Sequence, residues 1–299
     1  MVKQKSKKGL VSLIIINYNG GRVTLECIES ILKQDYKKIE IIVSDNGSKD
    51  DSIQQIKKRF PKVLILELGE NKGYAGGINE GLKRSSGEYI IVMNNDLILR
   101  KNTITEIIKR KEEADIFGVK NYYVSRPDTL WATGVKLNRL IMKAKLVGTM
   151  EKDVGQYDKT NFEHLVGSFL FIKRKVFDKI GGFDEDIFCY YEETEFQERA
   201  RRNGFRILFV PKATLLHHVA YSSGGGSNVT TDYYLVRNRG KFIRKYQVWY
   251  LKPVAYSSLL VETILRPIKQ IAKFKFRGSL NSWRGFFDFL KGIGGRKNF

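Results

Sequence analysis

Short apolar runs alternate with amphipathic segments along the first third of the chain. Continuous apolar runs are typical of strands buried on both faces of a sheet, and four of them lie at residues 11–16, 39–45, 63–67 and 88–93. Between them, apolar residues recur at helical spacing over 23–32, 51–60 and 75–83. Asp50 or Asp51 is a suitable N-cap for the second helix, and Pro61 ends it. This alternation predicts an α/β fold with a Rossmann-like, mostly parallel sheet and helices on both faces.

The strict alternation lapses after about residue 119. The later pattern predicts a strand at 165–173, a short helix at 175–180, an amphipathic helix at 194–203 and a strand at 205–210. Gly204 is the expected C-terminal cap of the amphipathic helix, and Pro211 is expected to end the last strand. We therefore predict one α/β domain over residues 10–245, with a basic N-terminal tail at 1–9 and an amphipathic, basic helical tail at 246–299.

The composition is that of a folded protein without a disulfide framework. The 299 residues are 42% hydrophobic and 12% aromatic, which excludes intrinsic disorder as the main state. Two cysteines, Cys27 and Cys189, are too few for a disulfide framework or a four-thiolate zinc site. The apolar run at 11–16 is too short for a signal peptide or a membrane span, so we expect a cytoplasmic location.

Basic residues exceed acidic residues, and the excess is uneven. The chain has 53 Lys and Arg against 32 Asp and Glu, a formal net charge of +21. The last 59 residues hold thirteen of these basic residues and only two acids, Glu262 and Asp288. This asymmetry indicates that the C-terminal segment is a separate unit with an anionic partner.

Polar clusters lie where three of the predicted strands end. They are Asn17-Tyr18-Asn19, Asp45-Asn46-Gly47-Ser48 and Asn94-Asn95-Asp96. A glycine-rich segment at 71–79 opens the third helix, where free N–H groups would favour a phosphate. Each cluster alone is also typical of an ordinary turn or of close helix packing. Their shared place at one sheet edge favours a ligand site, because ligands of open parallel sheets bind there.

Neither of two common nucleotide-binding motifs is present. The dinucleotide pattern G-x-G-x-x-G and the Walker pattern G-x-x-x-x-G-K-[ST] are both absent from the chain. The sequence therefore supports neither a dehydrogenase nor a P-loop NTPase.

Three carboxylates stand at the start of the predicted helix at 194–203. Glu192, Glu193 and Glu195 would stabilise the first turn of that helix, and like charges this close would also raise one another's pKa, which suits a general base. Both interpretations remain open on the sequence pattern alone. His217 and His218 are likewise either ordinary histidines or contacts to a metal or diphosphate.

Taken in order, these motifs resemble a known enzyme family. The first half of the resemblance rests on 11–19, Ser44-Asp45-Asn46-Gly47-Ser48, the glycine-rich segment 71–79 and Met93-Asn94-Asn95-Asp96. The second half rests on Gly167-Ser168, Gly181-Gly182-Phe183-Asp184, Tyr191-Glu192-Glu193, the arginine and glycine pattern at 199–204, Pro211, Ala213, His217, 222–225 and Tyr234-x-x-Arg237-Asn238. Over residues 10–245 the chain resembles the family-2 inverting glycosyltransferases with the GT-A fold, most closely their rhamnosyltransferase-type branch.

The resemblance implies a donor site for a nucleoside-diphosphate sugar. Asp45 would accept a hydrogen bond from the nucleotide base, with Asn17 and Asn19 nearby. The rest of the donor would contact Gly73, Gly76, Asn79, Asn94 and Asn95. Asp96 stands at the position of the family's D-x-D motif, so it would hold Mg²⁺ or Mn²⁺ on the diphosphate, with His217 as a further metal or diphosphate contact.

The resemblance also implies the catalytic base and the acceptor side. Glu193 matches the second acid of the family's acidic pair and would deprotonate an acceptor hydroxyl, with Glu192 as the reserve. The hydroxyl would then attack the anomeric carbon and invert its configuration. Trp131 and Asp184 would line the acceptor side. The acceptor would be a glycan or a lipid-linked molecule, which places the enzyme in polysaccharide or cell-envelope synthesis.

The basic tail has two interpretations. Residues 253–276 have Leu260, Ile264, Ile268 and Ile271 at helical spacing among several basic residues, followed by an aromatic group at 283–289. This pattern favours binding to an anionic membrane surface at the inner face of the cell membrane. The alternative is a helical extension that packs its apolar face on the catalytic domain.

Two other function classes remain as alternatives to sugar transfer. A nucleotidyltransferase would share a nucleotide-binding α/β architecture, but the segment after the first strand is a poor triphosphate loop. A nucleic-acid-binding protein would explain the net charge of +21, but no RNP-type, zinc-finger or helix-turn-helix pattern is evident, so we expect no nucleic-acid partner.

Overall fold

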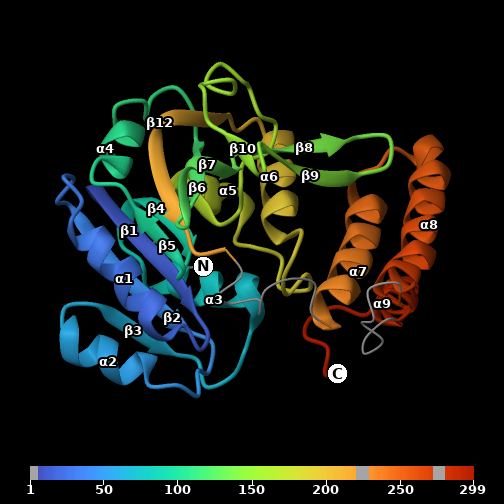
Figure 1. The fold of residues 1–299 in the computed structure, drawn as a ribbon, viewed down its shortest axis with the longest axis horizontal. Helices are drawn as coiled ribbons and strands as arrows, with labels where there is room; N and C mark the ends of the chain where they lie inside the picture. The colour runs from blue at the N-terminus through green and yellow to red at the C-terminus, as the bar shows by residue number, and fades with distance from the viewer. Residues whose placement is uncertain (1–5, 220–228, 272–279) are drawn as a thin grey trace.

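A large mixed sheet forms the centre of the molecule (Figure 1). The computed structural model describes residues 6–219, 229–271 and 280–299. The parallel part of the sheet has four neighbouring strands, in the order β4-β1-β2-β3. Their bounds are Lys7–Asn17 for β1, Ile39–Asp45 for β2, Leu64–Glu67 for β3 and Gly87–Asn94 for β4. The four strands predicted in the first third of the chain are therefore confirmed, and β1 begins four residues earlier than predicted.

Helices cover both faces of this sheet, as predicted. Alternate residues of β1 show why: Leu13 and Ile15 pack in one apolar core, and Ile14 packs in the other. The first core is covered by α1 (Gly21–Leu32), α2 (Ser52–Arg59) and α4 (Thr103–Ile108). The second is covered by α3 (Gly73–Arg84), α5 (Arg174–Ile180) and α6 (Glu192–Arg202). Because each strand buries both of its faces, its sequence is continuously apolar.

The second half of the chain extends the sheet on the β4 side. Strand β11 (Phe169–Lys173) pairs antiparallel with β4 and with β6 (Ile116–Tyr123). Beyond β6 lie β7 (Arg126–Ala132) and β10 (Glu151–Lys152). The expected mixed-sheet extension is confirmed, but the strand predicted over 165–173 begins only at Phe169.

The prediction that Pro211 ends a strand is wrong. Strand β12 (Ile207–His217) runs through Pro211 and pairs with β6 on both sides of an irregularity between Val210 and Thr214. A bulge is one of the few places in a sheet that tolerate a proline, because the residue there needs no ladder hydrogen bond. Past the bulge, β12 also pairs with the short strand β5 (Leu97–Leu99).

A separate hairpin and a helical unit stand on the far side of α6 (Figure 1). The hairpin consists of β8 (Gly134–Asn138) and β9 (Lys143–Val147). The helical unit consists of α7 (Val229–Tyr246), the short helix η1 (Trp249–Leu251), α8 (Lys252–Ile271) and α9 (Asn281–Leu290). The helix that we predicted over 253–276 therefore exists up to Ile271, and the remainder of that range lies outside the described residues.

The inner faces of α8 and α9 pack on α7. Ala255 and Leu259 of α8 and Phe289 of α9 share a buried core with Phe242 of α7. Two glycines allow the close approach of α9, since a Cβ on Gly240 would lie 2.5 Å from the Phe289 ring and one on Gly285 would lie 2.4 Å from the Tyr233 carbonyl oxygen. None of the helices among the described residues combines the length and apolarity needed to cross a bilayer.

Candidate functional site

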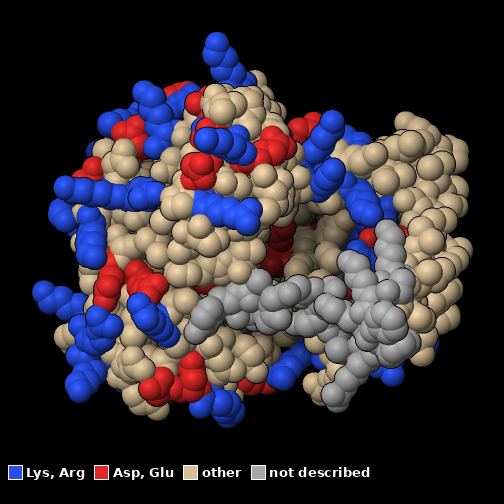
Figure 2. Space-filling view, in the orientation of Figure 1, with Lys and Arg blue, Asp and Glu red and all other residues tan. Residues whose placement is uncertain are grey.

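A cleft of about 660 Å³ lies between the sheet domain and the helical unit. Figure 2 shows it as a hollow with acidic atoms at its floor. Much of its lining comes from the carboxyl ends of β1 and β4, the hairpin β8–β9, the segment around the start of α6, and α7. The start of α3, the segment before β11, and the strands β7 and β12 contribute further residues. The cleft therefore lies at the sheet edge where we predicted a ligand site.

One end of the cleft holds Asp96 and His217. Asp96 lies between β4 and β5, and the pairing of Leu97 with His217 in the β5–β12 ladder brings the two side chains together. The distance between Asp96 Oδ1 and His217 Nε2 is 3.2 Å, and both side chains are buried. The two predicted metal contacts are thus neighbours, although more than a hundred residues separate them in the sequence.

This pair suits a divalent cation that is shared with a phosphate-bearing ligand. The Nδ1 atom of His217 has no hydrogen-bond partner among the described residues, and the Trp131 ring packs edge-on against the imidazole, with 4.2 Å between centroids. No group of three or more His, Cys, Asp or Glu that could hold a metal occurs in the described part of the chain. Because Mg²⁺-type sites often use one or two protein ligands together with phosphate oxygens and water, the two residues fit such a site.

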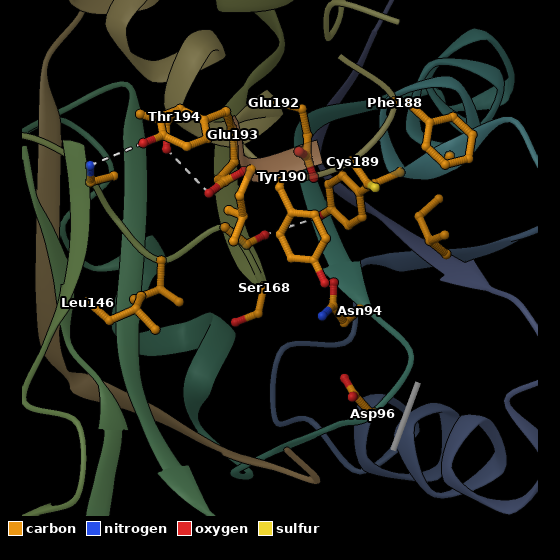
Figure 3. A pocket seen from close by; sticks show the side chains of 18 of the residues that line it. Asn94, Asp96, Leu146, Ser168, Phe188, Cys189, Tyr190, Glu192, Glu193 and Thr194 are labelled. Atoms are coloured by element: carbon orange, nitrogen blue, oxygen red, sulfur yellow. Dashed lines mark hydrogen bonds between the residues drawn. The ribbon is translucent and has the colours of Figure 1, made fainter. Parts of the chain in front are cut away.

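The other end of the cleft holds Glu192 and Glu193, at the first two positions of α6 (Figure 3). Burial raises the pKa of Glu192 well above its ordinary value, and the negative charge of Glu193 raises it further. Burial also raises the pKa of Glu193, although backbone N–H groups and the Thr194 hydroxyl partly oppose this. A helix N-terminus stabilises a carboxylate by roughly 0.3–1 kcal/mol, and here burial outweighs that effect.

Gly167 lies directly against Glu193. A Cβ at position 167 would lie 2.1 Å from Cγ of Glu193, so only glycine leaves room for this side chain. The carbonyl oxygen of Gly167 accepts a hydrogen bond of 3.0 Å from the Tyr74 hydroxyl. The Gly167-Ser168 motif therefore shapes the acidic end of the cleft.

The segment before α6 has an unusual backbone. Phe188, Tyr190 and Tyr191 have φ values of +66°, +62° and +75°, in the left-handed region that bulky residues rarely adopt. Figure 3 shows Tyr190 between the two ends of the cleft, with its ring extending from the side of Glu193 toward Asn94. Its hydroxyl lies 3.1 Å from the Thr231 hydroxyl of α7. Strained backbone of this kind is concentrated at functional sites.

Eight of the fourteen residues that we predicted for the site line the cleft. They are Gly73, Asn94, Asn95, Asp96, Trp131, Glu192, Glu193 and His217. The resemblance placed Trp131 on the acceptor side, and the structure places it against His217. The other six, Asn17, Asn19, Asp45, Gly76, Asn79 and Asp184, do not line it in this structure.

Asn17 and Asp45 form a buried network behind the cleft wall. The Asn17 side-chain amide donates to Asp45 Oδ1 at 2.8 Å and accepts from Thr24 and from the cleft residue Asn95. The Asp45 carboxylate also accepts from the N–H groups of Gly47 and Ser48 and from the Ser48 hydroxyl. The network therefore fixes the ends of β1 and β2. Asn19, in the loop after β1, is exposed and contacts Ser48 and Lys49 in the loop after β2.

The expectation of free N–H groups at the start of α3 is wrong. The N–H of Gly73 donates to the Asn71 side chain at 2.9 Å, and the N–H groups of Tyr74 and Ala75 point to the Phe188 carbonyl oxygen. The N–H groups of Tyr74 and Ala75 thereby attach the segment before α6 to the sheet domain. Asn79 serves the same purpose, because its side chain donates to and accepts from the backbone of Phe183.

Asp184 lies in the same attached segment, outside the cleft. Its carboxylate is 3.4 Å from Lys245 of α7. Gly76 packs against the Lys72 side chain, since a Cβ there would lie 2.7 Å from the Cβ of Lys72.

Several cleft residues were missed by the sequence prediction of the site. Tyr18, Asn46 and Ser168 stand within motifs that we singled out, and Tyr190 lies next to the motif Tyr191-Glu192-Glu193. A position in or beside a motif was therefore the available signal. For Val135, Leu146 and Leu235, which make up much of the apolar wall, no signal was available, because they come from the hairpin and from α7.

Comparisons with known proteins identify the family of this chain. The family model described as "Glycosyl transferase family 2" matches residues 12–181. The N-acetylglucosaminyl-diphospho-decaprenol L-rhamnosyltransferase of Mycobacterium tuberculosis is 25% identical over 239 residues, which cover 72% of this chain and 78% of the relative.

Solved structures show the same fold at low identity. Residues 1–349 of Staphylococcus aureus TarS, in complex with UDP-GlcNAc, match with a TM-score of 0.61 and 19% identity over 95% of this chain and 81% of that one. A mannosyltransferase from Pyrobaculum calidifontis, in complex with GDP-Man and Mn²⁺, matches with a TM-score of 0.57 and 17% identity over 94% of this chain and 84% of that one. From the family match and the shared fold together, the chain belongs to glycosyl transferase family 2 and is a glycosyltransferase of GT-A type.

Proposed function

We propose that this glycosyltransferase moves a sugar from a nucleoside-diphosphate sugar to a hydroxyl of a glycan or lipid-linked acceptor, with inversion at the anomeric carbon. The observation that carries the proposal is that one cleft has the Asp96–His217 pair at one end and the Glu192–Glu193 pair at the other. A donor diphosphate at the first pair leaves the acidic pair free to face the acceptor. Family membership ranks sugar transfer above nucleotidyl transfer and above nucleic-acid binding.

The acidic pair supplies the base. The pKa values of both carboxyl groups are raised by burial, and we assign the ionised member of the pair to Glu193, because the Thr194 hydroxyl donates to Glu193 whereas Oε2 of Glu192 has no partner among the described residues. Glu193 then takes the proton of the acceptor hydroxyl as the hydroxyl oxygen bonds to the anomeric carbon. The bond from that carbon to the diphosphate oxygen breaks, and the nucleoside diphosphate leaves with its electron pair. Attack from the face opposite the leaving group inverts the configuration.

Asp96 and His217 would hold Mn²⁺ or Mg²⁺. The Mn²⁺ in the Pyrobaculum mannosyltransferase structure supports a divalent ion in this fold. The bound ion would neutralise negative charge on the departing diphosphate. Asn95 orients the turn that carries Asp96, because its amide donates to Asn17 and Thr24.

The lipid-linked alternative for the acceptor rests on the relative and on the cleft wall. The mycobacterial relative is named for an acceptor linked to decaprenol through a diphosphate. In this chain the hairpin and α7 give the cleft an apolar wall that includes Val135, Leu146 and Leu235. An apolar wall suits an acceptor with an apolar part. A rhamnosyl donor is the corresponding expectation for the sugar.

Substitutions at the two ends of the cleft test the mechanism. We expect Glu193→Gln to lower kcat by at least about 100-fold, because general base catalysis contributes about 10²–10⁴. Asp96→Ala should also abolish turnover and weaken binding of Mn²⁺ in a titration. The measurement is release of nucleoside diphosphate with a panel of nucleotide sugars, and NMR of the product reports its anomeric configuration.

The control is Glu70→Gln, an exposed acid outside the cleft, which should keep normal turnover. Normal turnover in both Glu193→Gln and Asp96→Ala would contradict the mechanism. A product with retained configuration would contradict inversion.

We also propose that the protein lies on the inner face of an anionic membrane through α8. On the side of α8 that faces away from α7, a row of apolar side chains is exposed, including Val261, Ile264 and Ile268. Figure 2 shows the surface over α8 as largely uncharged. Among the basic residues of α8, Arg266 is bound by Asp232 and Glu262, so contact with lipid would rest on apolar burial more than on this charge.

Liposome flotation of the full chain tests this proposal. Replacing Val261, Ile264 and Ile268 together with Gln should reduce flotation with anionic vesicles several-fold, because each buried apolar side chain contributes about 1.5–3 kcal/mol. These substitutions leave the packed residue Leu259 in place, whereas removal of α8 would expose the core that it shares with α7. The control replaces two other exposed apolar residues, Leu140 in the turn of the hairpin β8–β9 and Val154 after β10. Equal flotation of both variants and the parent would defeat the membrane proposal.

A further inference from the structure

The segment 184–191, which we call the base loop, leads directly into Glu192 and Glu193. Three of its residues, Phe188, Tyr190 and Tyr191, have left-handed backbone conformations that an unsupported chain would leave. Because Tyr191 is the residue immediately before α6, its φ of +75° sets the direction in which the acidic pair enters the cleft. Contacts from outside the loop must therefore hold it.

Two adjacent residues of α7 supply most of these contacts. The Asn238 side-chain amide donates to the carbonyl oxygens of Ile187, Cys189 and Tyr190, at 2.9, 2.7 and 2.8 Å. The Arg237 guanidinium donates to the carbonyl oxygens of Asp186 and Ile187, at 3.3 and 3.0 Å. Both side chains are fully buried. Nearly every carbonyl oxygen between Asp186 and Tyr190 thus accepts a hydrogen bond from a side chain of α7.

The buried Arg237 guanidinium donates mainly to backbone carbonyl oxygens. Burying a guanidinium is costly unless its donors are satisfied, and a carboxylate is the usual partner. Among the described residues, no carboxylate pairs with Arg237, whose other contacts are the side-chain oxygen of Asn238, the Tyr233 hydroxyl and the faces of the Tyr233 and Tyr234 rings. Its Nη1 donates instead to the carbonyl of Gly295 at 2.7 Å. A buried cation used in this way fixes a backbone conformation.

Residues 292–299, which we call the strap, complete the arrangement. The N–H of Gly295 donates to the Asp186 carbonyl at 2.8 Å, so the strap touches both the base loop and Arg237. The N–H of Lys297 donates to the Tyr234 hydroxyl, and the Phe299 ring packs edge-on against Tyr233. The Tyr234 ring in turn stacks on Phe188, with 5.2 Å between centroids.

We propose that Arg237, Asn238 and the strap are positioning elements that hold the base loop, and through it the Glu192–Glu193 pair, in the geometry needed for proton transfer. The proposal rests on the proposed role of Glu193 as the base. None of these groups lines the cleft, so they act through the loop. The last described segment of the chain thereby serves the chemistry of the site in addition to any role in location.

Cys189 gives a readout that does not depend on activity. The chain has two cysteines: Cys27 is fully buried in the sheet domain, whereas Cys189 lies in the base loop, is half-buried and lines the cleft. Burial raises the pKa of the Cys189 thiol well above its ordinary value, and the charge of Glu192 adds to this. A thiol held in this way reacts slowly, and it should react faster when the loop opens.

The experiment uses three full-length or nearly full-length variants: Asn238→Ala, Arg237→Lys and a chain that lacks residues 294–299. Iodoacetamide labelling of Cys189, followed by peptide mass spectrometry, reports the loop. We expect labelling to accelerate about tenfold or more in Asn238→Ala and in the shortened chain. We expect kcat to fall on the order of 100-fold with the donor KM changed by less than about twofold, because misplacement of a base by about 1 Å has this effect.

Arg237→Lys should show smaller changes in both quantities, since Lys still donates to carbonyl oxygens but lacks the planar fork. The control is Arg284→Gln, an exposed change on α9 that should match the parent in both measurements. Should one buried variant fail to fold, the shortened chain still tests the proposal, because most strap residues are exposed.

Unchanged labelling and unchanged kcat in Asn238→Ala and in the shortened chain would overturn the proposal. Faster labelling with normal kcat would also overturn it, because the loop would then not govern the base. A failure of the proposed function has a different signature: Glu193→Gln would keep normal turnover, whatever the rate of Cys189 labelling.

Discussion

At the scale of single residues, Glu192 is the cleft residue whose burial is energetically most costly. It is buried, and its Oε2 atom has no hydrogen-bond partner among the described residues. Burial and the adjacent Glu193 carboxylate both favour its protonated form, so its pKa is raised. The folded protein therefore keeps a proton there to a higher pH than the unfolded chain does. Between the ordinary pKa of glutamate and the raised one, stability falls as pH rises.

Because stability falls as pH rises through this range, a prediction follows for Glu192→Gln. The amide removes the titration, so the variant should be more stable than the parent by about 1–3 kcal/mol at neutral to mildly alkaline pH, the usual cost of an unsatisfied buried group. Below the ordinary pKa of about 4.3 the carboxyl is neutral in both states, and the difference should vanish. Urea unfolding across this pH range measures it. A variant less stable than the parent at high pH would contradict the explanation.

The sequence predicted both acids and their mutual effect, because that effect depends on neighbours along the chain. It did not predict the position of Tyr190. A left-handed tyrosine is imposed by carbonyl contacts to Asn238, which is 48 residues away in the sequence, and no local pattern encodes such a contact. The roles of Asp45 and Asn79 show the same limit, since their partners come from other elements.

At the scale of secondary-structure elements, two close approaches shape the cleft. The β5–β12 ladder places His217 beside Asp96, and the Gly167 backbone contacts the Glu193 side chain. In the second case, a Cβ added to Gly167 would lie 2.1 Å from Cγ of Glu193. The helix and the loop therefore fit only while residue 167 has no side chain.

We accordingly expect Gly167→Ala to displace Glu193 and to lower kcat on the order of 100-fold, since a shift of about 1 Å in a reacting group costs this much. Donor binding at the Asp96 end should stay close to normal. Steady-state kinetics with the donor varied separates the two effects. The matched change is Gly181→Ala, where a Cβ meets nothing within 4 Å but the φ of +78° adds strain, so it should lower stability more than kcat. Similar kcat losses in both variants would count against a specific contact with Glu193.

The parallel half of the sheet was predictable because its strands are continuously apolar and each crossover helix is local. The strands β5 to β10 were not predicted, because they are short and their pairing joins distant segments. Pro211 misled the prediction of β12 for a physical reason, since the bulge that accommodates a proline depends on the partner strand β6. The sequence pattern therefore could not indicate that Asp96 and His217 are neighbours, and only the family resemblance suggested it.

At the scale of the whole molecule, α6 joins the sheet domain to the helical unit through buried carboxylates. Burial raises the pKa of Glu195, but hydrogen bonds from Arg199, Lys245 and Tyr246 outweigh it and lower the pKa. The pKa of Glu198 is also lowered, because His164, Arg202 and Arg139 outweigh its burial. Lys245 and Tyr246 belong to α7, and Arg139 follows β8.

Acid should therefore loosen this junction. A carboxylate whose folded pKa is lowered stabilises the fold above its unfolded pKa, and the contribution is lost as pH falls below about 4.3 toward the folded value. We expect unfolding stability to drop steeply in that range, and Glu198→Gln to be less stable than the parent at neutral pH with a flatter acid dependence. Thermal unfolding across the range measures both. An unchanged acid slope in the variant would argue against the junction as the origin.

The placement of the strap also orders events during synthesis of the chain. The ribosome makes the sheet domain and the Asp96 turn first, then α6, and the residues around Gly295 only at the end of the described chain. Until Gly295 reaches Asp186, the base loop lacks one of its outside supports. A nascent chain can thus fold its sheet domain before the base loop has all of its contacts. Under the proposed mechanism, such a chain would lack a fully positioned Glu193 until its last described residues had packed against the base loop.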